Sequence, residues 1–175
     1  MYPFIRFAIE WFRYRKTPMS FDETHLSYHR CLPWDIDPFM ELNNGRTLTL
    51  YDLGRVPMVV RMGLDTYLRK KGWGLTVAGS SVRYRKRIRM FDRIEMRTRI
   101  LGWDKRFIYI DQTMWLGAEC AGQALIRSAI FGPDGIVSPS ELAQDFGVDP
   151  ERFPLPTWVH AWIDADAQRV WPPEK

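Results

Sequence analysis

The period with which apolar and polar side chains alternate changes along the chain, and each period predicts a different kind of element. Between about residues 76 and 131 the period is two, as on a half-buried β-strand. Polar breaks interrupt this region at residues 91–93, 102–105 and 116–118. This spacing predicts an antiparallel meander of about four strands, and another strand is expected from about His25 to Trp34.

The segment from residue 43 to residue 62 fits neither period cleanly. Asn44-Gly45 is a common hairpin turn, and the positions after it alternate briefly. Helical spacing competes with this pattern at Leu48, Tyr51, Asp52 and Arg55. Apolar residues occur on all sides, as in a buried helix, so periodicity favours a helix only slightly. Pro57 is expected to bend that helix or end it early.

The opening residues 1–20 have the spacing of an amphipathic helix. Its predicted apolar stripe is Phe4, Phe7, Ala8, Trp11 and Phe12, with Arg6, Glu10 and Arg13 opposite. Such a stripe packs on its own domain or on a partner subunit. Alternatively, residues 3–16 lie on an anionic membrane surface, with Arg13, Arg15 and Lys16 at the headgroups. We expect neither a cleaved signal peptide nor a membrane-spanning helix here.

The last part of the chain, residues 138–175, is expected to form a helical extension. Ser138 and Pro139 are typical of a helix start, and that helix should stop at Gly147. Thr157 is expected to cap a last helix. Its predicted apolar face carries Trp158, Trp162 and Ala165. Residues 21–137 then form the central domain.

Composition adds limits to this picture. The chain has 175 residues, a net charge of +4 and 14% aromatic residues, as expected of one globular domain. The basic balance suggests an anionic partner without choosing one. Cys31 and Cys120 exclude a disulfide framework, and we expect two buried thiols in a reducing, cytoplasmic compartment.

The densest polar cluster in an apolar neighbourhood is the loop from Asp35 to Asn44. Asn43 or Asn44 can cap the helix that follows, leaving its first amides directed into the loop as an anion or oxyanion site. A nearby carboxylate can act as nucleophile or general base. Asp35 and Asp37 can equally serve as caps of the loop, and without further ligands they predict no metal site.

This loop resembles the signature of hotdog-fold acyl-CoA thioesterases, the group typified by 4-hydroxybenzoyl-CoA thioesterase. Many members carry Asp-x-Asp-x-x-x-His-x-Asn-Asn, and a helix with an acidic residue and an arginine follows. The loop here reads Asp35-Ile-Asp37-Pro-Phe-Met-Glu41-Leu-Asn43-Asn44, with Asp52 and Arg55 after it. The resemblance covers roughly residues 25–131.

The resemblance implies that Asp37 is the catalytic carboxylate and that a helix-start amide near Asn44 polarises the thioester carbonyl. Asn43 then organises the loop, and Ser80 or Ser81 contacts substrate across a subunit interface. Glu41 replaces the family histidine and adds negative charge beside Asp37, which either tunes a base or indicates a changed or absent activity.

Four arginines alternate after the serines: Arg83, Arg85, Arg87 and Arg89. On a strand they would share one face, either solvated or packed on a subunit. Alternatively, some of them or Arg93 bind the phosphates of CoA. Nucleic acid is not the expected partner, because Tyr84 points away from that face and no stacking platform forms.

The sequence therefore predicts an α+β hotdog fold, with a curved antiparallel sheet wrapped around one central helix and extra terminal helices. The predicted activity is hydrolysis of acyl-CoA or acyl-carrier-protein thioesters without metal or cofactor, by a homodimer or homotetramer. The alternative is a non-catalytic hotdog module that binds acyl thioesters or lipids. The identity of the acyl group does not follow from the sequence.

Overall fold

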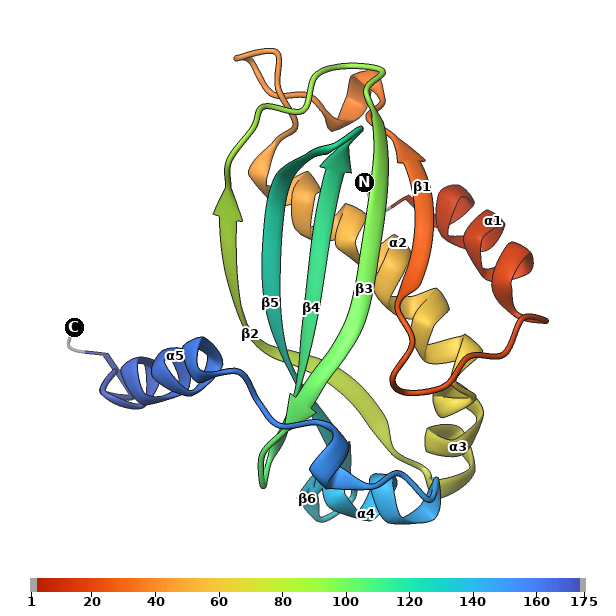
Figure 1. Ribbon diagram of the computed structural model, residues 1–175, viewed down its shortest axis with the longest axis vertical. Helices are drawn as coiled ribbons and strands as arrows, with labels where there is room; N and C mark the ends of the chain where they lie inside the picture. Colours follow the sequence, from red (N-terminus) through yellow and green to blue (C-terminus); the bar gives the residue numbers. More distant parts are fainter. Residues whose placement is uncertain (1–2, 174–175) are drawn as a thin grey trace.

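A curved antiparallel sheet dominates the computed structural model, which describes residues 3–173 (Figure 1). The strands are β1 His25–Arg30, β2 Gly74–Tyr84, β3 Arg93–Trp103, β4 Phe107–Leu116, β5 Glu119–Gly132 and β6 Gly135–Val137. Their order is β1-β3-β4-β5-β2, with β6 paired to β5. The long helix α2, Asn44–Arg61, lies against one face of this sheet, which confirms the α+β hotdog fold.

Helix α2 settles the ambiguity of residues 43–62 in favour of a helix. Asn43 is its N-cap, and the Asn43 side-chain oxygen accepts hydrogen bonds from the amides of Gly45 (2.9 Å) and Arg46 (3.2 Å). The expectation that Pro57 ends the helix early is wrong, since α2 continues to Arg61. Buried residues on both sides of Pro57 hold this turn against the core. Their packing therefore outweighs the loss of the hydrogen bond that proline cannot donate.

Close packing and a buried polar network fix α2 on the sheet. A Cβ at Gly54 would lie 2.6 Å from the sulfur of Met96, so a larger residue there would force the Met96 side chain or the helix to shift. The next residue, Arg55, donates to Gln112 of β4 at 2.7 Å, and Gln112 donates to the carbonyl of Tyr51 at 2.8 Å. Satisfied polar groups of this kind specify one register between helix and sheet.

The alternating arginines do not form a strand ladder. Strand β2 ends at Tyr84, and residues 85–92 form a loop. The amides of Arg85 and Lys86 both donate to the carbonyl of Ala121, and the carbonyl of Ile88 accepts from the amide of Leu42 at 2.8 Å. The segment leaves the sheet because Ile88 is buried and pairs with the acidic loop instead of with β5.

The remaining helices are α1 Phe4–Tyr14, α3 Leu64–Lys71, α4 Pro139–Asp145 and α5 Thr157–Ala167. The predicted face of the last helix is confirmed only at Trp162, which packs against Tyr109. Val159 is its buried residue and packs against Tyr109 and Leu125 of the outer sheet face, while Trp158 is exposed. Thr157 begins α5, and Pro156 holds the N-cap position. Ser138 does cap α4, and Gly147 follows its end with a positive φ.

The α1 stripe packs on its own domain only in part, at Phe7 and at the half-buried Trp11. Glu10 is buried and Arg6 is half-buried, whereas Phe4 and Phe12 are exposed. Arg6 donates to the carbonyl of Arg30 at 3.0 Å. Arg6 and Tyr14 find partners on β1 and in the acidic loop, which the helical pattern alone does not reveal.

The two edges of the sheet differ. Helix α1 covers the edge at β1, where Tyr14 donates to the Leu26 carbonyl at 3.2 Å and Arg6 donates to Arg30. Strand β2 pairs with β5 on one side only. Within residues 3–173 no segment pairs with its other side, so a long strand edge is left open.

No helix within residues 3–173 combines the length and apolar content needed to cross a bilayer.

Candidate functional site

The base of the acidic loop is a buried ion cluster around Asp35. Its carboxylate is fully buried and accepts hydrogen bonds from Arg6 (2.7 Å), Arg46 (2.7 Å) and the amide of Leu32 (3.0 Å). Burial alone would raise the pKa of Asp35, but these bonds and the positive charges outweigh it and hold the pKa below its usual value. Asp35 therefore anchors the loop to α1 and α2.

The tip of the loop is a short hairpin that carries Asp37 and Glu41. The Asp37 amide donates to the Glu41 carbonyl at 2.9 Å, and Ile36 pairs with Leu42. One carboxylate oxygen of Asp37 accepts from the amides of Phe39 (2.8 Å) and Glu41 (3.4 Å). These bonds fix the orientation of the Asp37 carboxylate while it stays half-exposed.

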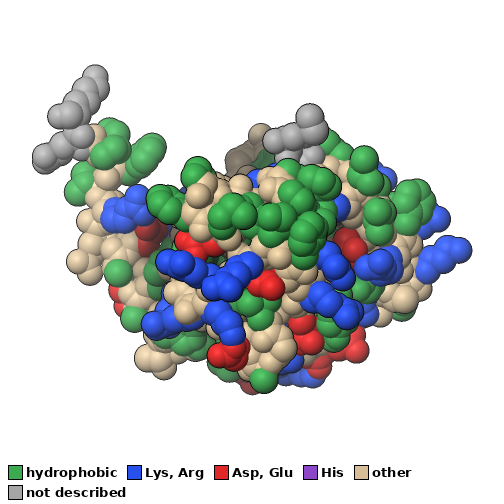
Figure 2. All heavy atoms as spheres, turned by 90° about the horizontal axis from the view of Figure 1, so that it is seen from above, with side chains coloured by type: hydrophobic (Ala, Val, Ile, Leu, Met, Phe, Trp, Pro, Cys, Tyr) green, Lys and Arg blue, Asp and Glu red, His purple; other side chains and the backbone are tan. Residues whose placement is uncertain are grey.

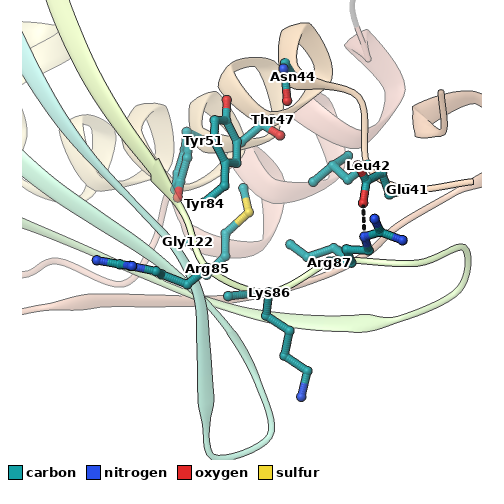
Figure 3. A pocket seen from close by; sticks show the side chains of 13 residues that line it. Glu41, Leu42, Asn44, Thr47, Tyr51, Tyr84, Arg85, Lys86, Arg87 and Gly122 are labelled. Atoms are coloured by element: carbon teal, nitrogen blue, oxygen red, sulfur yellow. Dashed lines mark ion pairs between the residues drawn. The ribbon is translucent and has the colours of Figure 1, made fainter. Parts of the chain in front are cut away.

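A cavity of about 370 Å³ lies between the start of α2, the end of β2 and the loop after it (Figure 3). Its apolar lining includes Leu42, Ile88, Met114 and Ala121. Its polar lining includes Asn44, Thr47, Tyr51 and Tyr84. An apolar slot with a few convergent polar groups is the usual form of a small-molecule site.

The helix cap leaves one backbone amide at the start of α2 unengaged, and its residue lines this cavity. The Asn43 side chain engages the amides of Gly45 and Arg46, and the Asn43 carbonyl engages that of Thr47. The cap therefore does not engage the amide of Asn44, the first helical residue and a lining residue of the cavity. A helix-start amide of this kind favours negative charge on a bound oxygen.

Tyr51 also lines this cavity. The side chain is fully buried, and its hydroxyl finds no hydrogen-bond partner among the described residues. Burial raises the pKa of Tyr51 far above its usual value, so the phenol stays neutral. Figure 3 shows it beside Tyr84 of β2. Neither tyrosine was predicted from the sequence as a site residue, although Tyr51 has the helical spacing of α2.

Three cations line the mouth of the same cavity: Arg85, Lys86 and Arg87. Arg87 pairs with Glu41 at 3.0 Å (Figure 3), and Lys86 pairs with Glu119. An adjoining hollow adds Arg89. The positive charge that the sequence places on a strand face is thus collected in a loop beside the apolar slot.

The structure brings together only some of the predicted site residues. Glu41 and Asn44 line the cavity, and Asn43 supports it as the N-cap. Asp37, four residues before Glu41, lies at the hairpin tip and does not line the cavity. The others lie outside it: Ser80, Ser81 and Arg83 on β2, and Arg93 at the start of β3.

The buried histidines belong to the β1 side of the core. Burial, and then the charge of Arg61, lowers the pKa of His25 to about 4. Burial, with smaller effects of nearby positive charges, lowers the pKa of His29 to about 3. Both rings therefore stay neutral near pH 7 and are structural. Residues 3–173 contain no cluster of three or more His, Cys, Asp or Glu side chains placed to hold a metal ion.

The fold, the acidic loop and the cavity together indicate which protein family this chain belongs to. Residues 31–163 match the family described as the Thioesterase-like superfamily, and the chain belongs to that family. This confirms the resemblance first noted in the acidic loop.

Two relatives carry the same name. "Protein THEM6" of Xenopus laevis is 33% identical over 111 residues, which are 62% of this chain and 54% of the frog protein. "Protein THEM6" of Drosophila melanogaster is 26% identical over 146 residues, 82% of this chain and 74% of the fly protein. The chain thus spans about half the length of the frog relative.

Solved structures share the fold at low identity. The probable thioesterase YbaW from Escherichia coli superposes with a TM-score of 0.65 at 14% identity, covering 69% of this chain and 94% of that one. The 1,4-dihydroxy-2-naphthoyl-CoA thioesterase Slr0204 from Synechocystis gives a TM-score of 0.61 at 12% identity, covering 71% and 95%.

Proposed function

We propose that this chain hydrolyses an acyl-CoA thioester at the cavity beside the start of α2. The observation that carries the proposal is that Asn44, whose amide the helix cap does not engage, lines an apolar slot together with three cations. The apolar slot suits an acyl group. The amide can donate to a thioester carbonyl, and the cations can bind the phosphates of CoA.

In the proposed reaction the Asn44 amide donates to the carbonyl oxygen and stabilises the negative charge that develops there. The Asp37 carboxylate either attacks the carbonyl carbon, forming an anhydride that water opens, or removes a proton from the attacking water. The carbon–sulfur bond breaks in both routes, and CoA leaves as a thiol after protonation. The two amides that bond Asp37 keep its carboxylate oriented for this role.

We also propose a homodimer that forms through β2. Its free edge runs over Gly74–Tyr84 and includes exposed Ser80 and Arg83. Pairing with a second copy would satisfy that edge and bring Ser80, Ser81 and Arg83 toward the partner's site. Asp37, outside the cavity of its own chain, would then complete a site that both copies share.

For CoA binding, the structure adds candidates to Arg83 and Arg93. Arg85, Lys86 and Arg87 line the cavity itself, so they are better placed to meet a phosphate. The same set of cations would also suit the phosphopantetheine arm of an acyl carrier protein.

A second candidate function is binding of an acyl thioester without hydrolysis. Glu41 occupies the position of the family histidine and is engaged by Arg87 rather than directed at a reacting group. This candidate predicts saturable binding of acyl-CoA with no release of thiol.

The experiment is a chromogenic assay of thiol release with short-chain, long-chain and aromatic acyl-CoAs. We expect turnover of at least one of them and its loss in Asp37→Asn, with fold and dimer intact. Asp134→Asn, at an exposed turn, is the matched control. Activity retained in Asp37→Asn but lost in Glu41→Gln would move the catalytic role to Glu41. Binding without thiol release in the parent chain would contradict hydrolysis.

A further inference from the structure

Helix α1 lies on the domain with its polar side inward. Arg6 bonds Asp35 at 2.7 Å, the buried Glu10 pairs with Arg13 at 2.9 Å, and Tyr14 donates to β1. An amphipathic helix on a globular protein ordinarily buries its apolar side instead. This placement leaves most of the apolar side of α1 in solvent, while Phe7 packs against the core.

The exposed apolar side is large. Ile5 is 79% exposed and Ile9 50%, and Phe4 and Phe12 share that side. The loop that Arg6 contacts also presents Trp34 and Phe39, the latter 80% exposed. Figure 2 shows hydrophobic side chains gathered across one face of the molecule, bordered by Lys and Arg. We call these six residues the apolar platform.

Positive charge lies next to both parts of the platform. Arg15 and Lys16 follow α1 directly, and the Arg15 guanidinium lies 4.7 Å from the ring centre of Phe12. The cationic loop 85–89 lies at the same end as the acidic loop, to which Ile88 and Arg87 connect it. Apolar side chains that enter the acyl region, with cations at headgroup level, match an anionic bilayer surface.

A second copy of the chain is a poorer occupant for the platform. The open edge suited to a second copy is β2, and β3, β4 and β5 separate it from β1 and α1 (Figure 1). Pairing at β2 would leave the platform of each copy exposed. A lipid surface also accounts for the cations, which an apolar contact between copies would not require.

We propose that the platform docks on the surface of an anionic membrane, with α1 lying in the plane of the headgroups. The Arg6–Asp35 ion pair ties α1 to the loop that carries Asp37, so docking holds the cavity mouth near the lipid. An acyl thioester dissolved in that lipid would reach the cavity without crossing water. Docking itself does not depend on hydrolysis.

The test is co-sedimentation of the full chain with vesicles of phosphatidylcholine alone or mixed with phosphatidylserine. We expect binding to the mixed vesicles that weakens with salt. Ile5→Ser and Ile9→Ser should each weaken it about tenfold. The matched control is Ile136→Ser, 46% exposed on β6, which should bind like the parent chain.

A second pair of variants tests the charge. Arg15→Glu with Lys16→Glu should reduce binding to the mixed vesicles, whereas Lys105→Glu with Arg106→Glu, in the exposed turn before β4, should not. Absence of vesicle binding by the parent chain at low salt would overturn the proposal. So would unchanged binding in the Ile5 and Ile9 variants, or a smaller oligomer in those variants without any lipid binding.

Discussion

The base and the tip of the acidic loop lie two residues apart, yet they are built differently. At the base, Asp35 is fully buried and held by Arg6 and Arg46. At the tip, Asp37 is half-exposed and accepts only backbone amides of its own hairpin. The same residue type thus anchors the loop at one position and is available for chemistry at the other. The predictions below test this division.

The largest effect on stability is expected at the base. Asp35→Asn removes the negative charge that balances Arg6 and Arg46 in a largely buried place. We expect the free energy of unfolding to fall by about 3 kcal/mol. Urea unfolding at fixed protein concentration measures it.

Asp37→Asn is the matched control for that experiment, because an asparagine oxygen can still accept the Phe39 and Glu41 amides. Its stability should change by less than about 0.5 kcal/mol. Equal stability of the two variants would contradict the division between base and tip.

The pH dependence of stability separates the contribution of Asp35 from that of the two buried histidines of β1. His25 and His29 have folded pKa values of about 4 and about 3, below the ordinary 6.5, so the unfolded chain binds more protons between these values. Stability should therefore fall as the pH drops below 6.5, by about 1.4 kcal/mol per pH unit for each histidine. Asp35, with a lowered pKa, should contribute only at more acidic pH.

Replacing one histidine checks this assignment. His25→Gln should flatten the decline between pH 6 and pH 4.5 by roughly half. His160→Gln, on the exposed side of α5, should leave the slope as it is. A slope that does not respond to His25→Gln would mean that other groups cause the decline.

A smaller effect is expected at the cavity mouth. Arg85 is exposed and lines the cavity, so Arg85→Ala should raise KM for acyl-CoA about fivefold, with little change in kcat. Added salt should reduce the difference, since exposed charges are screened. Arg106→Ala, in the turn before β4, is the control. A drop in kcat without a change in KM would argue against phosphate binding by Arg85.

The parts of the fold that were predictable depend on local chemistry. The Asn43 cap, the meander and the stop at Gly147 each follow from residues close together in sequence. Long-range partners decided the rest. Nothing near Arg6 in sequence shows that Asp35 will draw it inward, and the alternation at residues 85–89 conceals that Ile88 pairs with Leu42.

In the candidate site, too, local motifs were predictable and long-range contacts were not. The loop motif located Glu41, Asn43 and Asn44 at the cavity or its cap. Tyr51 and Tyr84 were missed, because their meeting needs α2 and β2 to be placed against each other. The relation of Asp37 to the cavity stays a prediction, since it rests on the proposed pairing of two copies.

The proposal that Asp37 is the catalytic carboxylate is tested most directly by measuring kcat for thiol release in Asp37→Asn and in the parent chain. The substrate is the acyl-CoA that the parent chain turns over best. Both proteins must show the same oligomeric state and unfolding midpoint. The account predicts a fall of about 10³-fold, as expected when a catalytic carboxylate is neutralised. A kcat within a factor of about three of the parent value would contradict it, because catalysis would then not depend on Asp37.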